Sequence, residues 1–416
     1  MLPLSLKMED HIYNMYKKAL CTGLLVCLLW LPAALYGQSV RTSGLRADSV
    51  RISLLTCSPS QPIYTLFGHT AIRYEEPALG RDYVFNYGMF SFRAPNFILR
   101  FVKGETDYLL GVEHYDEFRE EYEERGSAVY EQELNLTADE KQRLIRLLEW
   151  NSQPENRTYR YNFFYDNCTT RARDQIERCL AGKVEYRTHT PRLSFRRVVH
   201  QHTQHHEWAQ FGMDFCLGSR ADELIDGRTQ QFAPFRLMQS VDSAWVFRED
   251  GTCRPLAAPA SVLIEGRHHT DDDEPGCPTP TQSAWLLFAC VLLLTACGFR
   301  RGWRLAWLDV LLYAAAGAAG CVVAFLVGWS SHPTVSPNYL LWAFHPLHLL
   351  YVPYGIYAAV KGRPDIYLLA NAGVLGLFFV SAPFLPQVFQ PAVYPLVGVL
   401  WLRSLNSLKG WWKRKG

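Results

Sequence analysis

Hydrophobic and polar positions divide the chain into three regions: an apolar segment near the start, a long mixed region and an apolar C-terminal third. In the mixed region, short alternating runs are separated by turn residues, which is typical of half-buried strands. This pattern predicts strands at 50–56, 64–74, 82–86, 108–112, 130–134 and 159–165. The second and third of these runs follow each other closely and are expected to form a hairpin.

Helical periodicity fills the gaps between these strands. It predicts helices at 96–103, 115–122, 169–180 and 191–217. Thr137 and Glu140 have the spacing of a capping box, which predicts a further helix from there to residue 150. Strands and helices in this order indicate an α+β domain with an antiparallel sheet.

The apolar segment near the N-terminus, residues 19–36, follows Lys17 and Lys18. Such a segment is typical of a signal peptide or a signal anchor, and we assign residues 1–37 to it. Small residues near Gly37 and Gln38 allow cleavage there, but the cleavage pattern is imperfect, so an uncleaved anchor stays open. In either case the region that follows is expected to be exported.

The apolar C-terminal third contains spans at 283–299, 305–329, 338–360, 366–385 and 390–406. Several approach the ~20 residues needed to cross a bilayer, so we expect an all-α bundle of about five transmembrane helices. Lys and Arg occur in the first and third loops and after the last span, but not in the second and fourth loops. By the positive-inside rule, the loops with Lys and Arg and the C-terminus are cytoplasmic, and residues 38–280 lie outside.

These regions give a domain plan. We expect a signal segment at 1–37, an exported domain at 38–255, a linker at 256–282, a transmembrane helical domain at 283–406 and a basic cytoplasmic tail at 407–416. The acidic stretch at 271–274 is interpreted as a solvated tether. A net charge of +2, with no large basic block in the polar region, argues against nucleic acid as a partner.

The exported region holds six of the 11 cysteines, namely Cys57, Cys168, Cys179, Cys216, Cys253 and Cys277. If one of them is a free nucleophile, an odd number remains and not all of these can pair. Cys253 and Cys277 bracket a segment rich in Pro, His and Asp, and they are the pair we expect to form a disulfide. The connectivity is otherwise open.

Cys168 is the candidate nucleophile, because it stands just before the predicted helix at 169–180. At a helix start, unpaired backbone N–H groups and the positive end of the dipole favour a thiolate. Arg171 and Arg173 add to this positive field, and Asp166 lies close by in the sequence. The same three charged residues are equally compatible with a structural ion pair. A buried structural cysteine or a disulfide partner is the alternative interpretation of Cys168.

A thiol nucleophile needs a base within hydrogen-bond reach, and the base needs an orienting partner. His69 opens one predicted strand and Asn86 ends the next. In a hairpin they can lie side by side, where Asn86 would hold the imidazole of His69 in the tautomer that accepts the thiol proton. The alternative is that both are ordinary polar residues at strand ends. The backbone N–H of Cys168 is the expected oxyanion donor.

The histidines His200, His202, His205 and His206 lie in the predicted helix at 191–217. Such a cluster invites a zinc interpretation, but no Cys or Glu stands at a recognised metal spacing with it, such as His-Glu-x-x-His. We therefore interpret these histidines as a solvated face, and we predict neither a metal nor another cofactor.

The order His69, Asn86, Cys168 resembles circularly permuted papain-like families, such as the lecithin-retinol acyltransferase group, in which an Asn-Cys pair opens the nucleophile helix. The pair Asn167-Cys168 has this form. More closely, the chain resembles Lnb-type proteins, envelope lipoprotein N-acyltransferases of Gram-negative bacteria. The similar blocks are 54–57 (LLTC), 67–73 (FGHTAIR), 85–88 (FNYG), 165–170 (YDNCTT), 331–334 (SHPT) and 338–342 (NYLLW).

This resemblance implies a papain-like catalytic domain in the periplasm and a multi-pass domain in the inner membrane. It also implies a thioester mechanism, in which Cys168 takes an acyl chain from a phospholipid and passes it to the α-amino group of a lipoprotein's lipidated N-terminal cysteine. His69 and Asn86 would complete the catalytic set, with Asp166, Asn167 and Arg171 in support. The outer loops, with His332, Asn338 and Gln387, would guide substrate head groups or simply cap the membrane interface.

Two other classes of function stay open. The same residues suit a tethered cysteine peptidase or amidase that acts on the cell wall, because a papain-like fold does not dictate its reaction. The domain is also compatible with a non-catalytic envelope scaffold that binds lipid or protein, with Cys168 in a structural role.

Overall fold

The computed structural model describes residues 49–60, 63–187, 191–267, 277–303, 305–363 and 365–412, with backbone only from residue 407. The described residues belong to one compact unit, residues 47–416. The expected signal segment at 1–37, the acidic stretch at 271–274 and the end of the basic tail lie outside the described residues.

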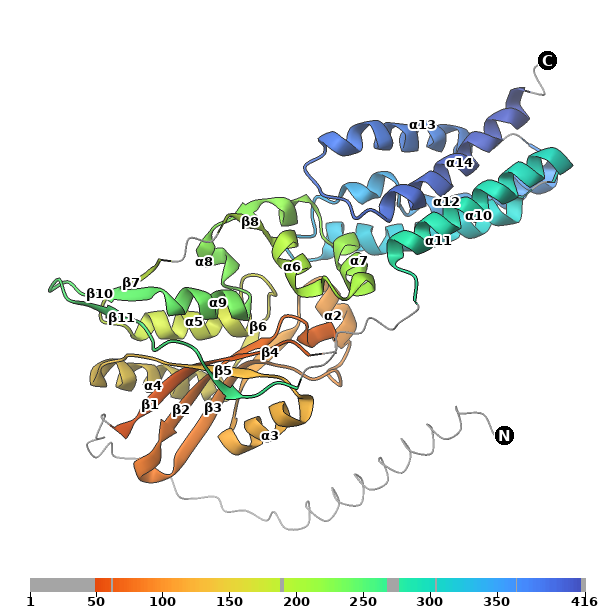
Figure 1. Cartoon of the computed structure of the whole chain (residues 1–416). Coiled ribbons are helices and arrows are strands. Elements are labelled where there is room, and N and C mark those ends of the chain that lie inside the picture. The colour runs from red at the N-terminus through yellow and green to blue at the C-terminus, as the bar shows by residue number, and fades with distance from the viewer. Residues whose placement is uncertain are drawn as a thin grey trace, which may run out of the picture. The chain divides into compact units, whose positions relative to one another are not determined.

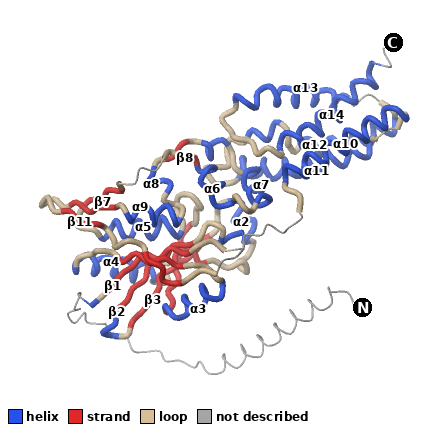
Figure 2. Tube along the Cα trace, in the orientation of Figure 1, coloured by secondary structure: helices blue, strands red, loops and turns tan. Residues whose placement is uncertain are grey.

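A seven-stranded antiparallel sheet forms the centre of the N-terminal part (Figures 1 and 2). In spatial order its strands are β12 (Ser261–Ile264), β5 (Val129–Glu133), β1 (Arg51–Cys57), β2 (His69–Glu76), β3 (Arg81–Met89), β4 (Asp107–His114) and β6 (Thr158–Arg160). The predicted hairpin is β2–β3. Because β12 lies in the segment expected to be a linker, the sheet continues beyond residue 255.

The last predicted strand, 159–165, is wrong in its second half, since β6 ends at Arg160. The side-chain oxygen of Asn162 accepts hydrogen bonds from the backbone N–H groups of Phe164 and Tyr165 at 3.1 and 3.2 Å. When an Asn side chain hydrogen-bonds the backbone of the residues that follow it, the chain forms a turn there instead of continuing as a strand. This turn delivers the chain to the helix that begins at Cys168.

Helices cover both faces of the sheet. On one face, Phe118 and Tyr122 of α3 (Tyr115–Arg125) pack against Ala71 of β2 in one buried cluster. On the other, Thr169 of α5 (Cys168–Cys179) bonds Thr70 at 3.1 Å. Neighbouring strand residues point to opposite faces, so Thr70 and Ala71 place the two helices on opposite sides. α4 (Ala138–Ser152) begins with the predicted capping box.

The predicted helix at 191–217 is wrong as a single element. It is broken into α6 (Phe195–Thr203) and α7 (Glu207–Cys216) by a turn at 204–206. The turn brings α7 back along α6, so that the buried guanidinium of Arg196 bonds Asp214 at 2.8 Å. A straight helix would hold these two residues far apart.

The remaining elements of this part are short. They are η2 (Ile63–Thr65), η3 (Pro77–Leu79), α2 (Phe97–Lys103), β7 (Lys183–Tyr186), β8 (Leu193–Ser194), η4 (Ser219–Asp222), β9 (Leu224–Ile225), α8 (Gly227–Gln230), α9 (Pro234–Asp242), β10 (Ala244–Phe247) and β11 (Cys253–Pro255). Strands β11, β10 and β7 form a small second sheet, and β8 pairs with β9.

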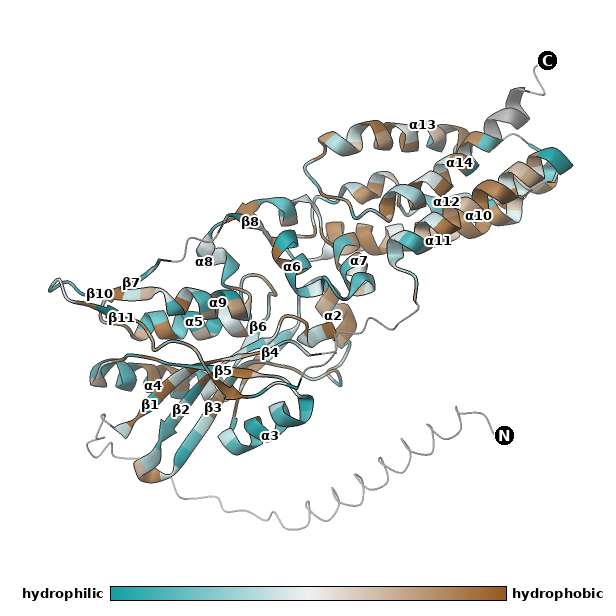
Figure 3. Ribbon diagram, in the orientation of Figure 1, coloured by the Kyte–Doolittle hydropathy of each residue, from teal (hydrophilic) through white to brown (hydrophobic). Residues whose placement is uncertain are grey.

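The C-terminal part is helical and largely apolar, as its brown colouring in Figure 3 shows. It contains α10 (Pro280–Arg301), α11 (Ala306–Trp329), η5 (Tyr339–Trp342), α12 (Leu347–Lys361), α13 (Ile366–Ser381), η6 (Ala382–Phe384) and α14 (Val393–Trp412). Among the described residues, 3 helical segments are long and apolar enough to cross a membrane: Pro280–Arg301, Ala306–Trp329 and Ile366–Phe384. The expectation of five spans stays a prediction.

The third predicted span, 338–360, begins later than expected, because α12 starts at Leu347. Asn338 caps the short helix η5 by accepting the backbone N–H of Leu340 at 3.1 Å. Pro346 then stands at the start of α12, where its missing N–H costs nothing. A continuous apolar run in the sequence is therefore two separate elements.

The α11–α12 and α13–α14 connections bond directly to the N-terminal part. The N–H groups of Gly218 and Ser219 donate to the carbonyls of Thr334 and Pro337 at 2.9 and 2.8 Å. The backbone N–H of Val388 donates to the Asp222 carboxylate at 3.1 Å. These bonds make the two Lys- and Arg-free loops part of one junction with the globular domain.

Candidate active site

Cys168 is the first residue of α5, so the helix begins one residue earlier than the sequence predicts. The side chain of Asn167 caps the helix, since its oxygen accepts the N–H groups of Thr169 and Thr170, both at 2.9 Å. The amide nitrogen of Asn167 donates to the carbonyls of Phe163 and Phe232. Asn167 therefore fixes the helix start and with it the position of the thiol, half-buried at the positive end of the helix dipole.

The imidazole of His69 hydrogen-bonds Cys168. Burial alone would raise the pKa of the thiol and lower that of the imidazole. The attraction and the hydrogen bond between the two groups outweigh burial. The pKa of Cys168 therefore lies below its usual 9.0, and that of His69 lies above its usual 6.5. These opposite shifts favour a thiolate beside an imidazolium.

Cys168 differs in this respect from other described cysteines outside the membrane part. Burial raises the pKa of Cys57, Cys179 and Cys216. Cys253 carries a free thiol, so the expected Cys253–Cys277 bridge is not formed. The environment of Cys168 thus stabilises a thiolate, whereas those of Cys57, Cys179 and Cys216 do not, which favours a reactive over a structural thiol at Cys168.

Asn86 holds the other side of the His69 ring. Its side-chain oxygen lies 3.0 Å from Nε2 of His69, and its amide nitrogen donates to the Glu113 carboxylate. Burial, followed by the charges of Glu121 and Glu117, raises the pKa of Glu113. Glu113 was not predicted from the sequence. Its place opposite Val84 in the β3–β4 ladder, beside Asn86, becomes visible only with the strand register.

Two glycines allow this close packing. Gly88, at φ +91°, lies against the nucleophile, and a Cβ there would stand 3.4 Å from the Cβ of Cys168. Gly68, at φ +76°, precedes His69, and a Cβ there would stand 2.4 Å from the carbonyl oxygen of Cys57. Both positions have a positive φ, which glycine adopts readily. The two glycines therefore permit the turn into β2 and the close approach of β3 to α5.

Threonines and tyrosines complete the surroundings of the thiol. The backbone N–H of Thr70 donates to Cys168, which lowers its pKa further. Tyr159 is buried, and its hydroxyl has no hydrogen-bond partner among the described residues. A Cβ at Gly88 would touch both Cys168 and this hydroxyl, at 3.4 and 3.9 Å. A buried donor without a partner beside a nucleophile is available to a bound oxyanion.

Asp166 and Arg171 form a two-pronged ion pair, with distances of 2.6 and 2.8 Å. The guanidinium of Arg171 also lies over the ring of Tyr159, at 3.5 Å from its centre. Arg173 points elsewhere, since it bonds Asp174 and the carbonyl of Arg228. Asp166 and Arg171 therefore hold the ring of Tyr159, whose hydroxyl lies near Cys168. Arg173 has a structural role.

Asn338 and Gln387, which the sequence leaves open as substrate guides or interface caps, lie at the junction with the globular domain. Both side chains are buried. Asn338 donates to the carbonyl of Phe215 and Gln387 to that of Leu217, and the two side chains bond each other at 3.0 Å. Their oxygens accept the backbone N–H groups of Leu340 and Tyr339. Within the described residues, the nitrogen and the oxygen of each amide have hydrogen-bond partners, which favours a structural role over contact with a head group.

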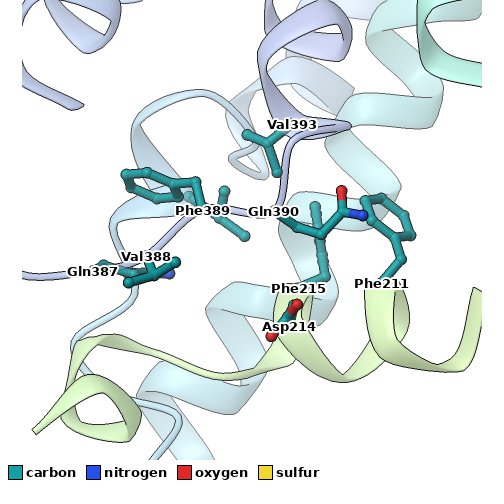
Figure 4. Close-up of a pocket in the computed structure, with 9 residues that line it drawn as sticks. Phe211, Asp214, Phe215, Gln387, Val388, Phe389, Gln390 and Val393 are labelled. Carbon is teal, nitrogen blue, oxygen red and sulfur yellow. The ribbon is translucent and has the colours of Figure 1, made fainter. Parts of the chain in front are cut away.

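Figure 4 shows this junction around a small depression that has no room for a water molecule. Phe211, Asp214 and Phe215 of α7 face the segment 387–390 across it. None of the predicted catalytic residues lines the depression. His332 lies apart from it and bonds the carbonyl of Phe101 in α2 at 2.8 Å.

The interpretation of the four histidines as a solvated face is also incomplete. His200 bonds the buried carboxylate of Asp214 at 2.9 Å, and His202 packs on the ring of Phe67 with centres 5.1 Å apart. Burial lowers the pKa of His202 to about 4. Within the described ranges, no group of His, Cys, Asp and Glu could hold a metal ion.

The globular domain, with a cysteine beside a histidine, is bonded to apolar helices, and this defines the class of membrane-attached proteins with an exported globular domain. Residues 37–201 match the family model of the Lnb N-terminal periplasmic domain, and residues 272–415 match that of the Lnb transmembrane domain. The chain belongs to the Lnb family, with a periplasmic N-terminal part and a C-terminal transmembrane part. No curated protein and no solved structure matched it.

Proposed function

We propose that this protein is a lipoprotein N-acyltransferase that works through a thioester on Cys168. The observation that carries the proposal is the Cys168–His69–Asn86 arrangement, with shifts of both pKa values toward an ion pair. It lies in a domain that is bonded directly to apolar helices. The Lnb family of the chain supports lipoprotein processing as its setting.

In the first step, the thiolate of Cys168 attacks the carbonyl carbon of a phospholipid ester. A C–S bond forms, the C–O ester bond breaks, and the imidazolium of His69 gives its proton to the departing lysophospholipid oxygen. The backbone N–H at the start of α5 stabilises the oxyanion, and the Tyr159 hydroxyl is placed to assist it.

In the second step, the α-amino group of the lipidated N-terminal cysteine attacks the thioester carbonyl. His69 takes a proton from the amine, the C–N amide bond forms and the C–S bond breaks, which restores the thiolate of Cys168. Both substrates are held in a bilayer by their lipids, so a site joined to membrane helices raises their effective concentration at the thiol.

We also propose that the protein is a multi-pass protein of the inner membrane, with the papain-like active site outside. The two loops without Lys or Arg bond to the globular domain, which supports their place on its side of the bilayer. The loops with Lys and Arg then face the cytoplasm, in agreement with the positive-inside rule.

The test compares N-terminal lipopeptides from cells with the native protein and with Cys168→Ser, by mass spectrometry, in a strain with no second N-acyltransferase. The expected result is the loss of one amide-linked acyl chain while the variant protein stays in the membrane. Unchanged triacylated lipopeptides would exclude the acyltransferase and favour the peptidase or the scaffold.

A further inference from the structure

The periplasmic domain has an exposed apolar surface on and around α2. We name it the α2 surface, and it consists of Ile63, Tyr64, Phe92, Ile98, Leu99 and Phe101. Each of these side chains is between 43% and 76% exposed. Single exposed apolar residues are ordinary, whereas a contiguous patch marks a site of interaction.

Ring contacts show that the surface is contiguous. Tyr64 meets Phe92 with ring centres 5.8 Å apart, and Phe92 meets Phe97 at 5.2 Å. Phe97 in turn stacks on Phe101 at 6.2 Å. These contacts join η2, the segment before α2 and the aromatic residues of α2, a helix that is mostly brown in Figure 3.

The α2 surface is fixed to the end of a membrane-spanning segment. α11 ends at Trp329, and the next residues bond to the last carbonyls of α2. Ser330 donates to Val102 at 2.8 Å, and the backbone N–H of Ser331 donates to Lys103, also at 2.8 Å. An apolar span must end where the hydrocarbon ends. Since α2 is bonded to that point, its exposed residues stand at the depth of the membrane interface.

A chain of aromatic rings leads from this surface to the nucleophile. Phe90 packs on Phe92 at 4.9 Å and stacks on Tyr108, also at 4.9 Å. Tyr108 stacks on Tyr161 at 4.0 Å. Tyr108 also pairs with Tyr159 in the β4–β6 ladder, and a Cβ at Gly88 would lie 3.9 Å from the Tyr159 hydroxyl and 3.4 Å from the Cβ of Cys168. The apolar surface and the thiol are thus two ends of one aromatic wall.

We propose that the α2 surface is immersed in the outer leaflet of the bilayer, and that acyl chains of its phospholipids reach Cys168 along the aromatic wall. The first half of this proposal, the immersion of the α2 surface in lipid, does not depend on the proposed function. The second half, the path of acyl chains to Cys168, rests on it. A bilayer fits the patch because aliphatic and aromatic side chains are mixed there, as at a membrane interface. Arg93 and Lys103 flank the patch, which suits phosphate head groups.

The experiment uses the full chain in vesicles of phosphatidylethanolamine and phosphatidylglycerol. A fraction of the lipid carries a photoreactive diazirine in its acyl chain, and adducts are mapped by peptide mass spectrometry after irradiation. We expect adducts on the α2 surface as well as on α10 and α11. In the double variant I98E/L99E the α2 adducts should fall to background. Leu79→Glu, at an equally exposed leucine of η3, is the matched control and should leave them unchanged.

Adducts confined to the spanning helices would overturn the proposal, and so would a surface that cross-links to a second copy of the chain instead of lipid. The adduct pattern does not require catalysis, so Cys168→Ser should give the native pattern even if the proposed function fails. For the second half, N-acylation by I98E/L99E should fall about tenfold or more, because acyl chains are no longer positioned at the thiol. Alkylation of Cys168 by iodoacetamide should persist. Full N-acylation by this variant would overturn the route along the wall.

Discussion

Nε2 of His69 lies 3.0 Å from the side-chain oxygen of Asn86, across the β2–β3 hairpin. A carbonyl oxygen can only accept, so Nε2 carries a proton and Nδ1 is the nitrogen that serves the thiol. Asn86 is in turn hydrogen-bonded to Glu113, so the orientation of the His69 imidazole depends on both of these side chains. This relay gives the first prediction.

Asn86→Ala should lower kcat for N-acylation about a hundredfold, because the ring loses its orientation while the thiol stays in place. Glu113→Gln is the matched comparison. Its side-chain oxygen can still accept from Asn86, so most activity should remain. Rates are measured with a diacylated lipopeptide and phospholipid in mixed micelles. If Glu113→Gln were as damaged as Asn86→Ala, the charge of Glu113 would matter more than its position.

The pKa directions at the site predict the pH dependence of thiol alkylation. Burial raises the pKa of Cys168, but the charge and the hydrogen bond of His69 stabilise the thiolate and bring this pKa below 9.0. The native protein should therefore keep a reactive thiolate as the pH falls below 9.0. In His69→Ala only burial and the weaker hydrogen bonds remain, so the midpoint of iodoacetamide labelling should move upward. An unchanged midpoint would mean that His69 does not share its proton with Cys168.

The sequence was sufficient to predict that Cys168, His69 and Asn86 lie together, because each is tied to local structure, while their catalytic roles stay predictions. Asn167 caps a helix, Gly68 opens a strand and the β2–β3 hairpin is short, so Cys168, His69 and Asn86 follow from near-neighbour patterns. Glu113 and Tyr159 were missed because strand register and the β4–β6 pairing bring them in from distant sequence positions. The burial of Asn338 and Gln387 was not predicted, because a polar loop in the sequence gives no sign of which of its side chains are buried.

Tyr159→Phe tests whether the unpartnered hydroxyl serves the transition state. In the part of the chain that the structure describes, the hydroxyl makes no hydrogen bond, so its removal should leave the free energy of unfolding unchanged or slightly higher. If it donates to the oxyanion, kcat should fall by about 10² to 10³ with little change in KM. Tyr87→Phe removes another buried hydroxyl without a partner and is the control. Equal activity of Tyr159→Phe and the native protein would leave the backbone N–H of Cys168 as the oxyanion donor.

Gln387→Ala should reduce stability rather than substrate affinity. It leaves the buried carbonyl of Leu217 with one donor fewer and removes the acceptor of the Tyr339 N–H, which costs about 1–3 kcal/mol. Thermal unfolding in detergent measures the loss. Gln153→Ala, at an exposed amide, should change stability by at most about 0.5 kcal/mol. A raised KM with native stability would restore Gln387 to the role of a substrate guide.

Of these substitutions, we expect the replacement of Arg196 to cause the largest loss of stability. Its buried guanidinium bonds Asp214 and Asp222, both at 2.8 Å, and also the carbonyls of Leu217 and Gly218. Arg196→Met leaves two carboxylates without their cation in a region that excludes water, which costs about 3–5 kcal/mol. Because Asp222 also accepts the N–H of Val388, the defect should spread to the junction with the membrane part.

The neighbouring Arg197 is exposed, so Arg197→Met keeps the same change of side chain without the buried pair. Limited proteolysis and thermal unfolding of the full chain in detergent compare the two variants. Arg196→Met should become sensitive to cleavage around 217–222 and unfold at lower temperature, while Arg197→Met behaves like the native protein. A native unfolding temperature for Arg196→Met would mean that the carboxylates of Asp214 and Asp222 take up protons or other partners at no cost, and that the junction does not depend on this ion pair.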